Sequence, residues 1–174
     1  MNDAFARSVA DRLQHLGMAT QVSVKKVGRH RIVDSSGHDL GDIDVLAADP
    51  ATRSIIAVEA KDFEIARTPA EIANELEKLF LGRKDKKSTI ELHGNRIDWL
   101  LRHVNDAIVT LHQEGDEGGW QVIGLVVTSD PLLTPLVRSS PIPVVPFDDL
   151  TRDSLGPVVA PRNPSSRRGR HKRR

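Results

Sequence analysis

Cysteine and tyrosine are both absent from this 174-residue sequence, and aromatic residues make up only 3% of it. Without cysteine, the chain has neither a disulfide framework nor a thiolate metal site. With so few aromatic rings, a platform on which single-stranded bases would stack is not expected. No apolar run approaches the roughly 18 residues that a membrane span requires, and the first residues lack a secretory signal pattern. We therefore expect a cytoplasmic protein with no membrane partner.

Charge is distributed unevenly along the chain. The formal net charge is only +1, yet the last residues, PRNPSSRRGRHKRR, carry seven of the 25 lysines and arginines and no acid. This composition predicts a disordered basic tail over residues 161–174, after a single domain over residues 1–160. Two roles remain open for the tail: it keeps the protein soluble, or it contacts phosphate groups through Arg167, Arg168 and Arg170.

Hydrophobic spacing predicts helices and strands in a clear order. A first helix near the N-terminus is followed by strand-like runs at 20–27, 41–48 and 54–62, the last two joined as a hairpin through the turn DPATR. The segment RTPAEIANELEKLF has the capping box and first-turn proline of a helix. A second helix is predicted over 95–113, a buried strand over 120–129, and then an edge strand among prolines. This order predicts an α/β (α+β) fold with a mixed central sheet flanked by helices.

Charged side chains gather at the open end of the predicted hairpin. In IIAVEAKD, Glu59 and Lys61 are two positions apart and share one face of an otherwise apolar strand. If the turn DPATR is centred between Ala51 and Thr52, Asp44 lies opposite Glu59 and Asp42 lies opposite Lys61. Directly opposed residues have Cβ atoms roughly 4.5–5.5 Å apart. Three carboxylates and one lysine would then share a site.

Two interpretations of this cluster remain open. Carboxylates this close repel each other unless a proton, a lysine or a cation lies between them. Oxygen ligands without cysteine or histidine suit Mg²⁺ or Mn²⁺, which lowers the pKa of bound water and neutralises charge on a phosphate, while Lys61 orients the water. Alternatively, Lys61 simply neutralises Asp42 or Asp44 in a structural ladder of ion pairs.

The segments GDIDVL and VEAK, one on each strand of the hairpin, resemble the motif of the PD-(D/E)XK nuclease superfamily. The element order is similar to the αβββαβ core of that restriction-endonuclease-like fold. The closing segment LVVTSDPLLTPLVRSSPIPVVPFDDL is similar to the Mrr-like and nuclease-related branches. The resemblance implies a metal-dependent DNA endonuclease that hydrolyses phosphodiester bonds in restriction, defence or repair.

Residue by residue, the resemblance implies Asp44, Glu59 and Lys61 as catalytic residues. Asp44, Glu59 and the backbone carbonyl of Ala60 would hold the Mg²⁺ or Mn²⁺ cofactor, and Asp42 is a rival for the first acid. The first helix departs from the pattern, because FARSVADRL lacks the glutamate that many relatives place there. This departure favours an alternative, a non-catalytic module that keeps the fold and binds nucleic acid or a partner protein.

DNA is the partner that the resemblance implies, and basic side chains outside the hairpin are candidates for its phosphates. They are Arg67, before the capped helix, and Lys84, Lys86 and Lys87 in the loop GRKDKKS, although these lysines could equally face solvent. His38 could reach the site as a proton shuttle or be an ordinary loop residue. Cleavage of both strands of a duplex generally takes two sites, so a homodimer is compatible with the expected function.

Overall fold

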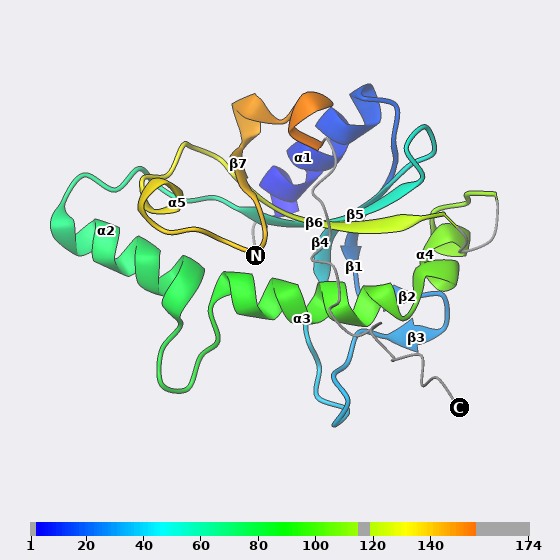
Figure 1. The fold of residues 1–174 in the computed structure, drawn as a ribbon, viewed down its shortest axis with the longest axis horizontal. Coiled ribbons are helices and arrows are strands. Elements are labelled where there is room, and N and C mark those ends of the chain that lie inside the picture. The colour runs from blue at the N-terminus through cyan, green and yellow to red at the C-terminus, as the bar shows by residue number, and fades with distance from the viewer. Residues whose placement is uncertain (1–2, 115–118, 156–174) are drawn as a thin grey trace, which may run out of the picture.

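The computed structural model describes residues 3–114 and 119–155, and its centre is a mixed sheet of five strands with helices on both faces (Figure 1). The strands of the described residues are β1 (Ala19–Val24), β2 (Lys26–Val27), β3 (His30–Arg31), β4 (Ile43–Asp49), β5 (Ser54–Lys61), β6 (Gln121–Thr128) and β7 (Val144–Pro146). The sheet order is β1-β4-β5-β6-β7, while β2 and β3 form a separate hairpin. Pairing is antiparallel from β1 through β5 and parallel from β5 through β7. The predicted α/β (α+β) class with a mixed central sheet is confirmed.

Helices cover both faces of the sheet. Those of the described residues are α1 (Asp3–His15), α2 (Pro69–Leu76), the π-helical turn η1 (Glu77–Leu81), α3 (Thr89–Leu101), α4 (Val104–Thr110), α5 (Thr134–Val137) and the short 3₁₀ turns η2 (Phe147–Asp149) and η3 (Asp153–Leu155). Figure 1 shows α1 on one side of the sheet and α3 and α4 on the other. Within the described ranges, no helix combines the length and the apolar character that crossing a membrane takes.

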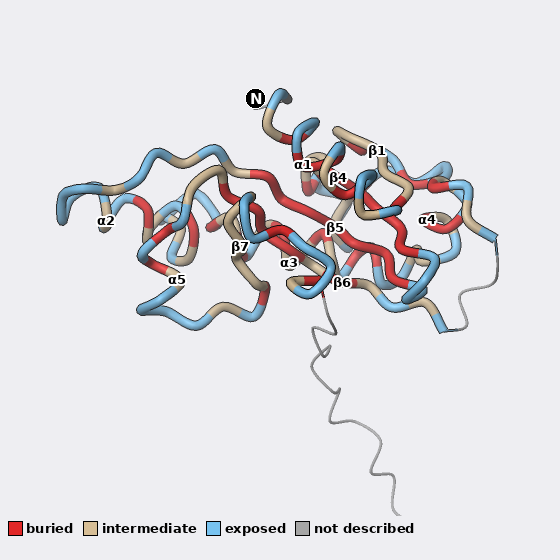
Figure 2. The backbone as a smooth tube through the Cα atoms, turned by 90° about the horizontal axis from the view of Figure 1, so that it is seen from above, coloured by how far each residue is buried: buried red, intermediate tan, exposed pale blue. Residues whose placement is uncertain are grey.

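The alternation of side chains along β4 and β5 separates two apolar layers. One layer joins α1 to the side chains of Val45, Ala47, Ile56 and Val58. The other joins α3 and α4 to the side chains of Leu46, Ala48, Ile55 and Ala57. Figure 2 shows the central strands as the buried part of the chain, whereas α2 is largely exposed at one end. Because Asp44 and Glu59 continue the second series, they lie on the face that α3 covers.

The segment between β5 and α3 begins with the predicted capping box. Thr68 accepts from the Glu71 backbone N–H, and the Glu71 side chain accepts from the Thr68 N–H, so α2 starts where the sequence indicates. After η1, Gly82 takes a positive φ of 70°, a conformation that glycine adopts without strain. Two main-chain hydrogen bonds between Arg83 and Lys86 then close a tight turn in the basic loop.

The predicted helix over residues 95–113 differs from the observed one at both ends and in the middle. Ser88 caps α3 by accepting from the Glu91 N–H, so the helix starts at Thr89. The helix ends at Leu101, and α4 follows as a separate element. The break lies at His103, whose ring donates to the Trp99 carbonyl at 2.8 Å. The Trp99 carbonyl also accepts the Arg102 N–H at 3.1 Å, and the His103 N–H donates to the Leu100 carbonyl at 2.9 Å, so the last turn of α3 is tightened to the 3₁₀ pattern.

Candidate active site

The register of the β4–β5 hairpin is the predicted one. Ala48 pairs with Ile55 and Leu46 pairs with Ala57, all on the face that α3 covers. The next pair on this face is Asp44 and Glu59. The backbone pairing ends just before them, since Val45–Val58 is the last pair of the ladder.

Asp44 occupies the point where β4 and β5 separate. Its Oδ2 accepts the Ala60 backbone N–H at 2.9 Å. The Asp44 side chain thus takes the place of the β4 carbonyl that would accept this N–H if the strand pairing continued. Burial raises the pKa of the Asp44 carboxyl, the charge of Glu59 raises it further, and the positive charge of Lys61 opposes both. The carboxylate form of Asp44 is therefore less stable than that of a free aspartate, and an additional positive charge would stabilise it.

Glu59 is buried, with 5% of its surface exposed, and each of its carboxylate oxygens has a cationic partner. Lys61 Nζ lies 2.7 Å from Oε1. Nη1 of Arg96, on α3, donates to Oε2 at 2.6 Å. These are short, charge-assisted contacts, and they fix the carboxylate within the layer between β5 and α3.

Asp42 does not join this cluster. Its Oδ2 lies 3.9 Å from Nζ of Lys25, and it precedes the first residue of β4. Lys61, which we expected opposite Asp42, instead contacts Glu59. The structure thus brings together two of the three predicted carboxylates, Asp44 and Glu59, and leaves Asp42 apart from them.

Two residues of the site were missed by the sequence analysis, His93 and Arg96 on α3. Nε2 of His93 donates to the Ala57 carbonyl at 3.0 Å, which leaves the lone pair on Nδ1. Nδ1 lies 3.9 Å from Glu59 Oε2 and has no hydrogen-bond partner among the described residues. Burial lowers the pKa of His93 to about 4, and the nearby Glu59 charge only partly opposes this. His93 is therefore neutral near pH 7.

A sequence signal for these two residues did exist. Ser88 and Glu91 have the spacing of a helix N-terminus, which sets the start of α3. From that start, His93 and Arg96 are three positions apart and share one helix face, which in the structure is turned toward β5. Two polar side chains on an otherwise apolar face indicate a buried polar partner.

The oxygen atoms at this point are of the type that a small divalent cation binds. Asp44 and Glu59 supply carboxylates, and the carbonyl of Ala60 is on the same edge of β5 as its N–H, toward Asp44. Within residues 3–114 and 119–155, no group of three or more histidine, aspartate or glutamate side chains could hold an ion together. Mg²⁺ often takes only one or two protein carboxylates and keeps several waters, so the smaller donor set suits it.

A groove of about 430 Å³ opens beside Glu59, and most of its charged lining is basic. The basic residues that line it are Lys61, Lys78, Arg83, Lys86, Lys87 and Arg96. Its acidic lining residues are Glu59 and Glu77, and Glu77 holds the Arg83 guanidinium with hydrogen bonds of 2.5 and 2.8 Å. The predicted lysines Lys86 and Lys87 thus lie in the wall of the cavity that contains Glu59 and Lys61.

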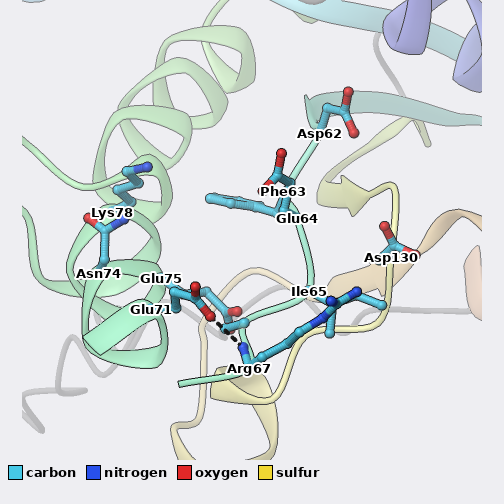
Figure 3. A pocket seen from close by; sticks show the side chains of 11 residues that line it. Asp62, Phe63, Glu64, Ile65, Arg67, Glu71, Asn74, Glu75, Lys78 and Asp130 are labelled. Atoms are coloured by element: carbon cyan, nitrogen blue, oxygen red, sulfur yellow. Dashed lines mark hydrogen bonds between the residues drawn. The ribbon is translucent and has the colours of Figure 1, made fainter. Parts of the chain in front are cut away.

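Two further predicted phosphate contacts, Lys84 and Arg67, do not line the groove. Lys84 is exposed in the same loop but does not line the groove. Arg67 lines an adjoining cavity of about 620 Å³, which shares Phe63, Asn74 and Lys78 with the groove (Figure 3). Its backbone N–H donates to Glu71 at 2.7 Å. The acidic residues that line this cavity are Asp62, Glu64, Glu71, Glu75 and Asp130, an environment that does not attract phosphate.

His38 is a loop residue in the structure. Its side chain is 80% exposed, and its Nδ1 lies 3.4 Å from Asp34, its partner in the same loop. The predicted tail contacts Arg167, Arg168 and Arg170 lie outside the described residues. They remain a prediction.

A comparison of the chain with protein-family models, with curated proteins and with solved structures found no match in any of the three. The case for a function therefore depends on the geometry of the site.

Proposed function

We propose that this protein is a metal-dependent nuclease that hydrolyses phosphodiester bonds of DNA, with Asp44, Glu59 and Lys61 as its catalytic residues. The observation that carries the proposal is their juxtaposition: two acids meet where β4 and β5 separate, and a lysine lies 2.7 Å from the buried one. The raised pKa of Asp44 supports it, because a carboxylate destabilised by burial and by a neighbouring negative charge is suited to bind a cation.

Each residue has a role that follows from its position. Asp44, Glu59 and the Ala60 carbonyl would hold Mg²⁺ or Mn²⁺, which supplies charge neutralisation at the phosphate and acidification of water. Lys61 carries three N–H donors on a flexible stem, and its side chain is 36% exposed in the groove. From there it can orient a water molecule or donate to a non-bridging phosphate oxygen.

The groove provides the surface for the substrate. Its wall holds Lys78, Lys86 and Lys87 together with Glu59 and Lys61, and lysine side chains bind phosphate groups without regard to base sequence. A nucleic acid backbone along this wall would bring a phosphodiester group to Lys61. This arrangement supports binding of DNA through its backbone, as the resemblance of the sequence implies.

A non-catalytic binding module is the second candidate. Both oxygens of Glu59 already have cationic partners, so two carboxylates face two fixed positive charges without any added ion. The groove would still bind phosphates in such a module. The two candidates differ in one measurable property, because the module would bind DNA and leave its backbone intact.

Plasmid cleavage with a matched pair of acid variants tests the proposal. Supercoiled DNA with Mg²⁺ or Mn²⁺ should be nicked or linearised by the wild type and by Asp42→Asn, whose carboxylate pairs with Lys25. Asp44→Asn should lose the activity while its far-ultraviolet circular dichroism stays unchanged. Cleavage by Asp44→Asn at the wild-type rate would refute the assignment, and intact DNA with the wild type under all conditions would favour the binding module.

A further inference from the structure

Arg96 is a buried cation between α3 and β5. It is 8% exposed, and its Nε donates to the Leu40 carbonyl at 2.7 Å while Nη1 donates to Glu59 Oε2 at 2.6 Å. One guanidinium thus links the segment before β4, the end of β5 and α3. Because arginine is protonated at every pH that a protein tolerates, this positive charge is permanent.

The surroundings leave Arg96 little freedom to move. Gly41 passes it with a positive φ of 77°, and a Cβ atom at this position would lie 2.9 Å from Nη2 of Arg96. One helical turn earlier, His93 packs in the same layer and is held by the Ala57 carbonyl. The guanidinium therefore stays beside Glu59 instead of extending into solvent.

The charges that meet at this point balance without an added ion. Asp44 and Glu59 contribute two negative charges, whereas Lys61 and Arg96 contribute two positive charges, and the neighbouring His93 is neutral near pH 7. One divalent cation would give the site a net positive charge that suits a phosphodiester anion. A second would double that charge within a few ångströms of Arg96, where repulsion in a partly buried site is strong.

We propose that Arg96 is the built-in counter-charge of the site, which limits the site to one divalent cation and weakens the binding of that ion. The proposal rests on the proposed function, since it assumes that Asp44 and Glu59 bind a divalent ion. In this site Arg96 supplies the positive charge on Glu59 Oε2, and Lys61 supplies the one on Oε1.

A purely structural role for Arg96 makes a different prediction. If it served only to join α3 to β5, neutral substitutions would lower the thermal stability and leave the affinity for cations unchanged. If Arg96 is the counter-charge, neutral substitutions raise that affinity. A unit charge about 5 Å from a divalent ion changes the binding constant about tenfold or more, even when water screens it.

Isothermal titration calorimetry with MnCl₂ tests the proposal on the full chain. The wild type should bind one ion, Arg96→Gln and Arg96→Met should bind Mn²⁺ at least about tenfold more tightly, and Arg96→Lys should stay within about threefold of the wild type. Arg102→Gln, at the end of the same helix, is the matched control for the change in net charge and should match the wild type.

Each outcome bears on the proposal. Two ions in the wild type, or unchanged affinity in folded neutral variants, would overturn the counter-charge and leave the nuclease assignment in place. No uptake of Mn²⁺ by the wild type would overturn both. Thermal melting checks that the variants fold. If neither neutral variant folds, the number of Mn²⁺ ions bound by the wild type decides: one ion supports the proposal, and two ions overturn it.

Discussion

Arg96 Nη1 lies 2.6 Å from Oε2 of Glu59, although 37 positions separate the two residues in the sequence. Because Lys61 contacts the other oxygen, both carboxylate oxygens of Glu59 have a cationic partner. Asp44, which accepts one hydrogen bond from the Ala60 N–H, is the acid whose pKa is raised by burial and by the charge of Glu59. The site thus contains one carboxylate with two cationic partners and one whose pKa is raised.

Asp44→Asn should stabilise the folded protein when no divalent cation is present. Asparagine keeps an oxygen for the Ala60 N–H and removes the repulsion by Glu59, which across two strands amounts to at most about 1 kcal/mol. Thermal melting in EDTA should show an increase in Tm of up to about 2–4 °C.

Asp42→Asn is the matched control, because this acid forms a long surface contact with Lys25. We expect its Tm to stay within about 1 °C of the wild type, as is usual for exposed ion pairs. A lower Tm for Asp44→Asn would show that its carboxylate stabilises the fold, as in a structural ladder of ion pairs.

His93 should make the stability depend on pH between about 6.5 and 4. Its pKa in the folded protein is about 4, below the usual value of 6.5, so the unfolded chain binds its proton first as pH falls. The stabilisation that neutral His93 gives the folded protein is complete above pH 6.5 and is lost as pH falls toward 4. The free energy of unfolding decreases by about 3 kcal/mol at most over this range.

Urea unfolding of the wild type and of His93→Gln across this pH range isolates the effect. The free energy of unfolding of the wild type should fall more steeply with decreasing pH than that of the variant. Parallel curves would mean that His93 titrates alike in the folded and unfolded chains, and that its buried position does not exclude the charged form.

Lys86 and Lys87 should contribute to DNA binding through phosphate contacts, since both line the groove beside Glu59. In fluorescence anisotropy with a labelled duplex and EDTA, their double replacement by alanine should weaken binding. The slope of log K against log salt concentration should become less negative by about 2. Each phosphate contact contributes about −0.9 to this slope, and two contacts are lost.

Lys84→Ala provides the control in the same loop, because Lys84 is exposed but does not line the groove. It should leave the salt dependence near that of the wild type. An equal effect of Lys84 would indicate that the loop acts through its net charge, without a defined path for the DNA backbone.

The hairpin at the site was predictable because its signals are local. A turn between two apolar runs sets the register, and the register alone places Asp44 opposite Glu59. The helix that starts after Thr68 was equally predictable, since its capping box lies within four consecutive residues. Such features depend on neighbours in the chain and not on how distant elements pack.

The contact of Arg96 with Glu59 could not be predicted in this way. It depends on the angle at which α3 crosses β5, which the whole apolar layer around Trp99 and Leu100 determines. Arg67 shows the same limit, since its position after β5 suggested a phosphate contact, whereas the path of residues 62–67 brings it into an acidic cavity. Long-range packing decides which surface an exposed charge faces.

The most direct test of the nuclease assignment is Mg²⁺-dependent plasmid cleavage by Lys61→Met, compared with wild type and with Lys25→Met. Lys25 is an exposed lysine with its own acidic partner, and its replacement should leave the rate unchanged. We expect Lys61→Met to bind DNA and to cleave it at least about 100-fold more slowly, as for the loss of a donor at the reacting phosphate. Cleavage by Lys61→Met at the wild-type rate would contradict the assignment.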